Sequence, residues 1–170
     1  SGDVIVDGQE IQGLTLGGVG FGTTLEYIEV FGSGDDGIEI FGGTASLKKL
    51  VVYGYDDDGF DGDHGWNGYA QYVLVLNTPN IDAIAADHAI ELDGDDTDDL
   101  GSDEDNMTAD GRPFASAHLT NFTVIGAHST DDQAVRFRRG FGGSFTNSLI
   151  ANFAAVEGLR IDNNGGVFDA

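Results

Sequence analysis

Residues 35–41 read Asp-Asp-Gly-Ile-Glu-Ile-Phe, and residues 57–63 read Asp-Asp-Gly-Phe-Asp-Gly-Asp. The second stretch repeats the pattern of the first after 22 residues: two turn-forming aspartates, a glycine, an apolar anchor and an acid. Equivalent anchors recur with spacings of 24, 22, 30, 45 and 24 residues, at Leu14, Ile38, Phe60, Ile90, Val135 and Leu159. A recurring period of this length is typical of solenoid proteins, in which each repeat stacks on the previous one.

Each repeat also contains a second segment that is rich in β-branched and aromatic residues. These segments are bounded by Gly or Asn and lie at residues 25–32, 47–54, 70–77, 119–126 and 145–152. They favour short strands. Two or three short strands per repeat, without a helical period, predict an all-β protein that folds as a parallel β-helix of about six coils. An antiparallel sandwich is the alternative, although it gives no reason for the similarity between repeats.

The two long spacings indicate insertions, one at about residues 79–86 and a longer acidic one at about residues 93–116. We therefore expect a single β-helix domain over residues 1–170 with a long acidic loop. We also expect the chain to be a fragment or a processed subunit of a longer protein.

Acidic residues dominate the charge of the chain. Thirty Asp and Glu residues face seven Lys and Arg residues, which gives a net charge of −23 and argues against binding to nucleic acid or to anionic lipid. Aspartate supplies 23 of the 30 acids, and there are 27 glycines, a combination that marks turns. Salt adaptation is an alternative origin of the acidity, but it would spread over Asp and Glu alike. No apolar run is long enough to insert into a membrane.

Stacking of the repeats converts equivalent positions into columns. The residue after each anchor is expected to point outward, which places Thr15, Glu39, Asp61, Glu91, Arg136 and Arg160 in one column. Neighbouring acids in such a column repel one another and need cations, raised pKa values or water between them. A solvated face with a partial ladder of salt bridges is the plainer interpretation.

A further pair of columns lies at the turn before each anchor. One contains Asp35, Asp57, Asp87 and Asp132, and the other contains Asp36, Asp58, His88, Gln133 and Glu157. Each aspartate could cap its own backbone in an Asx turn, or several could bind Ca²⁺, which prefers carboxylate and carbonyl oxygens. We expect at least one Ca²⁺, with candidate ligands Asp35, Asp36, Asp56, Asp57, Asp58, Asp61, Asp63, Asp87, Glu91, Asp93, Asp95 and Asp132. The four histidines have no metal-ligand spacing and are expected in turns or on the surface.

Aromatic residues gather in the third repeat and the one before it. Trp66 and Tyr69, with Tyr53 and Tyr55, are candidates for a platform on which sugar rings stack. Aromatic residues that close the coils of a β-helix are an equally plain interpretation.

Residues 13–30, 35–44, 56–61 and 65–72 together resemble a family of bacterial secreted or cell-surface proteins of unknown function, often described as hypothetical or labelled as transporters. Its members share a Gly-Val-Gly-x-Gly-Thr-Thr stretch, an Asp-Asp-Gly-x-Glu element and a Gly-Trp-x-Gly segment, which here begin at Gly18, Asp35 and Gly65. The resemblance implies an extracellular, right-handed parallel β-helix and no particular activity.

Two functions remain open from the sequence. The first is a non-enzymatic, Ca²⁺-stabilised extracellular β-helix that serves as a structural, adhesive or matrix element. Its open strand edges would allow end-to-end self-association into filaments. The second is a polysaccharide-active enzyme, a lyase or a glycoside hydrolase, with a site around Asp35, Asp36, Asp61, Asp63, His64 and Arg136. Arg136 or Arg160 is the candidate base of a lyase.

Overall fold

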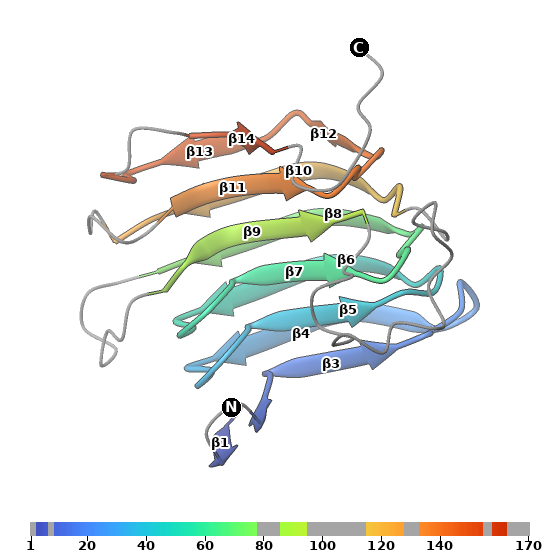
Figure 1. Ribbon diagram of the computed structural model, residues 1–170, viewed down its shortest axis with the longest axis horizontal. Helices are drawn as coiled ribbons and strands as arrows, with labels where there is room; N and C mark the ends of the chain where they lie inside the picture. The colour runs from blue at the N-terminus through green and yellow to red at the C-terminus, as the bar shows by residue number, and fades with distance from the viewer. Residues whose placement is uncertain are drawn as a thin grey trace.

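Strands make up all of the regular structure in the described part of the chain. A computed structural model describes residues 3–6, 9–77, 86–94, 115–127, 133–154 and 158–162. A two-stranded antiparallel hairpin comes first and consists of β1 (Asp3–Val6) and β2 (Gln9–Ile11). The remaining strands form two parallel sheets, which lie face to face (Figure 1).

The sheet here called the acidic sheet has the order β14-β11-β9-β7-β5-β3. Its strands are β3 (Leu14–Gly17), β5 (Ile38–Phe41), β7 (Phe60–Asp63), β9 (His88–Asp93), β11 (Gln133–Arg138) and β14 (Arg160–Ile161). The second sheet, called the bent sheet, has the order β12-β10-β8-β6-β4, with β13 also paired to β10. Its strands are β4 (Thr24–Phe31), β6 (Ser46–Tyr53), β8 (Tyr69–Leu76), β10 (His118–Ile125), β12 (Ser144–Thr146) and β13 (Leu149–Ala151).

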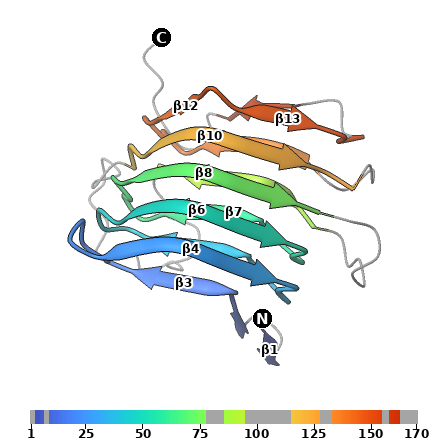
Figure 2. The same cartoon turned by 180° about the vertical axis from the view of Figure 1, so that it is seen from behind.

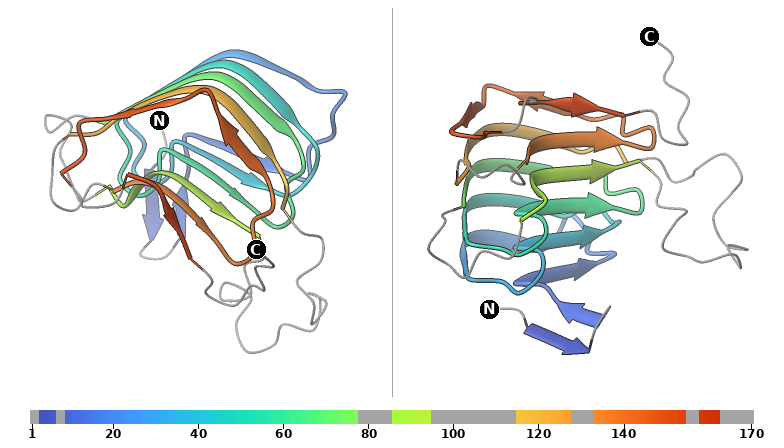
Figure 3. Two further views of the ribbon diagram at one scale, coloured as in Figure 1. Left: turned by 90° about the horizontal axis from the view of Figure 1, so that it is seen from above. Right: turned by 60° about the vertical axis from the view of Figure 1, so that its left-hand side comes forward.

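From β3 to β12 consecutive strands alternate between the two sheets, β13 follows β12 within the bent sheet, and every pairing within the two sheets is parallel. Each coil therefore contributes one strand to each sheet, and successive coils lie over one another when the molecule is viewed from above (Figure 3, left). This is a right-handed parallel β-helix, as predicted. The antiparallel sandwich is wrong, because both large sheets are parallel throughout the described residues.

The alignment of repeats predicted from the sequence matches the pairing of residues between neighbouring strands of the acidic sheet. The anchors pair in order, Leu14 with Ile38, Ile38 with Phe60, Phe60 with Ile90 and Ile90 with Val135. The middle anchors are fully buried in the core between the sheets. Leu159 departs from the expected inward orientation: it is exposed and precedes β14, the outermost strand of the acidic sheet.

The bent sheet has a kink in the middle of each long strand. Tyr27, Lys49, Tyr72 and Asn121 have φ near +60°, and the residues on either side of them keep a parallel register with the next strand. Asn147, between β12 and β13, has φ +50° and continues the series. The kink interrupts the alternation of inward and outward side chains along the strand. As a result Lys48 and Lys49 are both exposed, while Leu47 and Leu50 are both buried. Figure 2 views this sheet from the front.

Trp66 and Tyr55 lie inside the molecule. Trp66 is fully buried, packs against Phe60 and donates a hydrogen bond from its Nε1 atom to the carbonyl oxygen of Ala45 at 3.0 Å. The sugar-stacking platform expected from these two aromatics and their neighbours is therefore wrong. Their large apolar rings gain more free energy from burial between the coils than from exposure.

The predicted long insertion falls largely outside the described residues, which stop at Gly94 and resume at Ala115. Its two ends meet, since the backbone N–H of Ala115 donates to the carbonyl oxygen of Gly94 at 3.3 Å. No helix in the described residues is long and apolar enough to cross a membrane.

Candidate metal centre

The acids predicted in one outward column do pair across the acidic sheet. Thr15 is in register with Glu39, Glu39 with Asp61, Asp61 with Glu91, and Glu91 with Arg136; Arg136 then pairs with Arg160. Side chains alternate across a strand, so this column faces away from the apolar core. Its three carboxylates are nevertheless buried, with only 6–8 % of each residue exposed. The expectation of a solvated face is wrong for Glu39, Asp61 and Glu91.

The turn columns are held together by side chains that reach from one coil to the next. Asp36 Oδ1 accepts the backbone N–H of Asp58 at 2.8 Å, and Asp58 Oδ1 accepts the backbone N–H of His88 at 2.7 Å. The Asx-turn interpretation, in which each aspartate caps its own backbone, is wrong for these two residues. Their carboxylates instead satisfy a buried donor in the following coil.

These contacts bring the turn columns and the outward column together into what we call the carboxylate face. Three groups of side chains offer ligand atoms that lie within 4.8 Å of one another. The groups are Asp36 with Glu39 and Asp61, Asp58 with His88 and Glu91, and Asp35 with Asp36 and Asp57. The first two groups are entirely buried.

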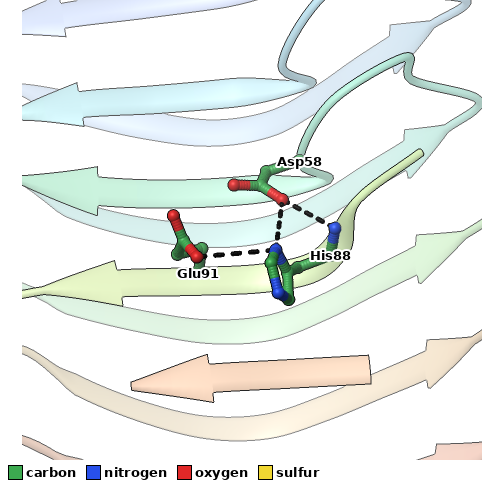
Figure 4. A group of neighbouring side chains, drawn as sticks. All are labelled: Asp58, His88 and Glu91. Carbon is green, nitrogen blue, oxygen red and sulfur yellow. Dashed lines mark hydrogen bonds and ion pairs between the residues drawn. The ribbon is translucent and has the colours of Figure 1, made fainter. Parts of the chain in front are cut away.

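His88 is a member of this face that the sequence analysis expected in a turn or on the surface. It is 1 % exposed, and its Nδ1 atom lies 3.2 Å from Asp58 Oδ1 and 3.5 Å from Glu91 Oε1 (Figure 4). Burial, helped by nearby arginines and opposed by the charge of Asp87, lowers the pKa of His88 to about 4, so the ring is neutral at pH 7. The tautomer with its proton on Nδ1 donates a hydrogen bond to Asp58.

The carboxyl groups have strongly perturbed acidity. Burial, opposed by the hydrogen bond from the Asp58 backbone and helped by the charges of Asp35 and Asp57, raises the pKa of Asp36 to about 8. Burial also raises the pKa values of Asp58 and Asp61 well above their ordinary range, with repulsion from neighbouring carboxylates as the second cause. Glu91 is raised to about 7 by burial, although Arg138 and Arg136 act in the opposite direction.

Arginines neutralise one end of the carboxylate face. Arg138 Nη2 lies 2.5 Å from Glu91 Oε2, and Arg136 Nη1 lies 3.2 Å from Glu91 Oε1. Asp93, which is fully buried, pairs with both Arg138 and Arg139. Arg160 pairs with Asp162 instead. Among the described residues, Asp36, Asp58 and Asp61 form no ion pair with a lysine or an arginine.

The structure separates the predicted ligands into those that meet and those that do not. Asp35, Asp36, Asp57, Asp58, Asp61 and Glu91 belong to the three groups. Asp56, Asp63, Asp87 and Asp93 lie on the same turns and strands but outside these groups, and Asp95 and Asp132 lie outside the described residues. Glu39 and His88 were not among the predicted ligands, although their places in the repeat columns were the signal that could have found them.

The residues of the predicted enzyme site are only partly together. Asp36 and Asp61 share a group, and the charge of Asp63 contributes to the raised pKa of Asp61. His64 instead packs edge-on against the Phe41 ring, with 5.5 Å between ring centroids. Arg136 contacts Glu91 rather than either aspartate.

Chemically, the group of Asp36, Glu39 and Asp61 offers only oxygen ligands, which suits a hard cation such as Ca²⁺. In the group that contains His88, the backbone N–H and the Nδ1 atom of the histidine already contact Asp58 Oδ1. Of the two fully buried groups, the one made only of carboxylates, Asp36, Glu39 and Asp61, is therefore the best candidate for a metal centre in the described residues.

The fold and this face define the class of the protein as a parallel β-helix with an acidic outer sheet. The chain belongs to the family described as a pectate-lyase like beta helix domain, which it matches over residues 1–168. Searches among curated proteins and among solved structures find no match.

Proposed function

We propose that this protein is a non-enzymatic, extracellular β-helix that binds Ca²⁺ at Asp36, Glu39 and Asp61 and serves as a structural or adhesive element. The observation that carries the proposal is the burial of three carboxylates whose oxygens lie within 4.8 Å of one another. Carboxylates this close cannot all be ionised without a large cost, unless a cation lies among them.

A divalent cation offsets the cost of burying these charges and the repulsion between them, which together raise the pKa values of Asp36 and Asp61. Asp36 and Asp61 have no arginine or lysine partner among the described residues, so their charges are compensated by protonation or by a bound ion. Three carboxylates without a dedicated binding loop make a modest site. Ca²⁺ sites of extracellular modules have Kd values on the order of 10⁻⁴–10⁻³ M, which fits a secreted location.

Thermal unfolding tests the cation. Stability should rise with CaCl₂ and fall back with EGTA, by about 2.7 kcal/mol at a free concentration of 100 times Kd, while NaCl of equal ionic strength has no such effect. Asp61→Asn should abolish the Ca²⁺ response. Glu29→Gln, at an exposed position on the bent sheet, is the matched control and should retain it. A response that is equal for Ca²⁺ and NaCl, or unchanged in Asp61→Asn, would refute the site.

The structural role rests on the ends of the stack. β3 and β4 are the outermost strands at one end, and β14 at the other end follows the exposed Leu159 and ends in the exposed Ile161. Outer strand edges with apolar side chains favour association with a second copy of the chain. Sedimentation velocity and electron microscopy at increasing concentration should reveal end-to-end oligomers. Monomers at all concentrations would contradict this role.

A polysaccharide-active enzyme is the second candidate, favoured by the family and by Arg136 beside the carboxylate face. Groups with perturbed pKa values, such as Glu91, are common in active sites. The test is release of oligosaccharides or unsaturated products from a panel of neutral and acidic glycans, with and without Ca²⁺. Turnover that disappears in Asp61→Asn and Arg136→Lys would establish the enzyme, and no turnover on the panel would reject it.

A further inference from the structure

The positive-φ residues of the bent sheet form a row on its outer side, which we call the bend row: Tyr27, Lys49, Tyr72, Asn121 and Asn147. They fall at the same point of successive strands, because the paired residues on both sides of each bend are in register. Tyr27 is 73 % exposed and Tyr72 is 53 % exposed. The row therefore presents two aromatic rings and two amides to solvent, on a sheet that does not carry the carboxylate face.

The residue types in this row are not those that the backbone prefers. The left-handed conformation costs a typical L-residue roughly 1–2 kcal/mol, whereas Asn adopts it more readily. Asn121 and Asn147 fit this preference, and Tyr27, Lys49 and Tyr72 do not. The conformation recurs at the same point of successive coils, so stacking of the coils imposes it, and the type of side chain at each bend is left to other demands.

The two tyrosines differ in what covers them. Lys49 Nζ lies 4.3 Å from the centroid of the Tyr27 ring and donates a hydrogen bond to its hydroxyl, so one face of that ring is occupied. Tyr72 forms no hydrogen bond or ring contact with any described residue; it interacts electrostatically with Lys49 and is 53 % exposed.

A hollow adjoins Tyr72 on the next two coils of the same sheet. It has a volume of about 350 Å³ and is lined by Asn121, Phe122, Thr123, Asn147, Ser148 and Leu149. Asn121 Oδ1 accepts hydrogen bonds from Gln71 Nε2 at 3.1 Å and from the Thr120 hydroxyl, which leaves its Nδ2 atom as a donor. The side-chain amide of Asn147 has no hydrogen bond within the described residues.

We propose that Tyr72 and this hollow bind a neutral oligosaccharide. One sugar ring stacks its C–H face on Tyr72, and the hydroxyls of the following sugars accept from and donate to the amides of Asn121 and Asn147. The span from the Tyr72 strand to the Asn147 turn is two rungs, roughly 10 Å at the spacing of strands, which accommodates about two sugar rings. The net charge of −23 disfavours an anionic glycan, although Lys48 and Lys49 lie on β6, the strand paired with that of Tyr72.

Titration with defined glycans tests the proposal. The probes are neutral hexasaccharides of β-linked glucose, xylose and N-acetylglucosamine, with hexagalacturonate as the anionic comparison, measured by calorimetry or by NMR shifts. We expect one of the neutral probes to bind. Tyr72→Asn should weaken its affinity roughly tenfold, while stability stays equal or rises, because Asn relieves the left-handed strain.

Two controls separate this surface from others. Tyr69→Ala removes an exposed tyrosine of the same strand whose ring stacks on His118 instead, and it should leave the affinity within about twofold. Asp61→Asn, on the acidic sheet, should also leave it unchanged, so the glycan result does not depend on the Ca²⁺ site. No binding of any neutral probe, binding of hexagalacturonate alone, or equal affinity in Tyr72→Asn would overturn the proposal.

Discussion

The side chain of Asp58 closes the turn of the following coil, because its Oδ1 atom accepts the backbone N–H of His88 at 2.7 Å. The same atom lies 3.2 Å from His88 Nδ1, so one carboxylate oxygen serves both the main chain and the ring. Asp58 thus stabilises this turn through an acceptor oxygen, and the hydrogen bond does not require a negative charge. Its raised pKa is the consequence of placing this acceptor in the buried carboxylate face.

Two substitutions at Asp58 should therefore act in opposite directions. Asp58→Asn keeps an acceptor and removes the charge, so the free energy of unfolding at pH 8 in EGTA should stay the same or increase. Asp58→Ala leaves the N–H of His88 without this acceptor and should cost about 1–3 kcal/mol. Urea denaturation measures both, with Glu29→Ala as the exposed control. If both variants lost the same free energy of unfolding, Asp58 would stabilise the fold through its charge and not through its hydrogen bond.

The pH dependence of stability should also report on the carboxylate face. The pKa of Asp36 is raised to about 8 and that of Glu91 to about 7, so between pH 6.5 and 8 the folded state binds more protons than the unfolded chain. Stability in EGTA should consequently fall as the pH rises through this range, by on the order of 1–2 kcal/mol. His88, with its pKa lowered to about 4, opposes this trend only below about pH 6.5.

Ca²⁺ provides the contrast for the pH experiment. Cation binding requires ionised carboxylates, so saturating CaCl₂ should flatten or reverse the fall in stability between pH 6.5 and 8. Melting temperatures measured at several pH values, with EGTA or with CaCl₂, give both curves. A stability that rises with pH in EGTA would contradict the raised pKa values of Asp36 and Glu91.

The ion pairs of Asp93 should contribute far more to the free energy of unfolding than an ion pair on the surface. Asp93 is fully buried beside Arg138 and Arg139, so Asp93→Asn leaves two partly buried guanidinium groups undercompensated and should cost about 3 kcal/mol. Glu26→Gln breaks the exposed pair with Lys49, at 3.9 Å, and should leave the free energy of unfolding nearly unchanged. Denaturation of both variants at low and high salt measures the difference. Comparable losses would mean that burial of Asp93 adds nothing to its pairing.

The sequence predicted the register well because stacking imposes it. Main-chain hydrogen bonds between coils force equivalent residues such as Ile38 and Phe60 to lie side by side, so a repeat seen in sequence becomes a pair in space. Period-two alternation likewise placed Glu39 and Asp61 away from the core. This pattern could not predict that the two carboxylates are buried. It indicates on which side of the sheet a side chain lies, but not which neighbouring side chains cover it.

The bends of the bent sheet were beyond sequence reasoning for a different reason. Asn121 and Asn147 carry a signal for the left-handed conformation, but Lys49 and Tyr72 carry none, and only the stacking on neighbouring coils imposes it on them. His88 was misjudged because a lone histidine among aspartates is indistinguishable from a turn residue until Asp58 and Glu91 are placed beside it.

Close packing between coils makes one glycine indispensable. A Cβ atom at Gly68 would lie 1.8 Å from the carbonyl oxygen of Ala45 and 2.4 Å from Trp66 Nε1, the two groups that share a hydrogen bond across coils. Gly68→Ala should therefore cost about 1–3 kcal/mol and expose Trp66 to solvent. Urea denaturation and the emission wavelength of this single tryptophan measure both effects.

Gly20 supplies the matched control, because a Cβ atom there meets nothing within 4 Å. Gly20→Ala should leave stability unchanged or raise it by about 0.4–1 kcal/mol, through the lower entropy of the unfolded chain. The two substitutions add the same methyl group, so any difference between them measures contact in the folded state. A Gly68→Ala variant as stable as Gly20→Ala, with unshifted emission, would mean that Ala45 and Trp66 can separate without cost, and that the hydrogen bond between them does not hold these coils together.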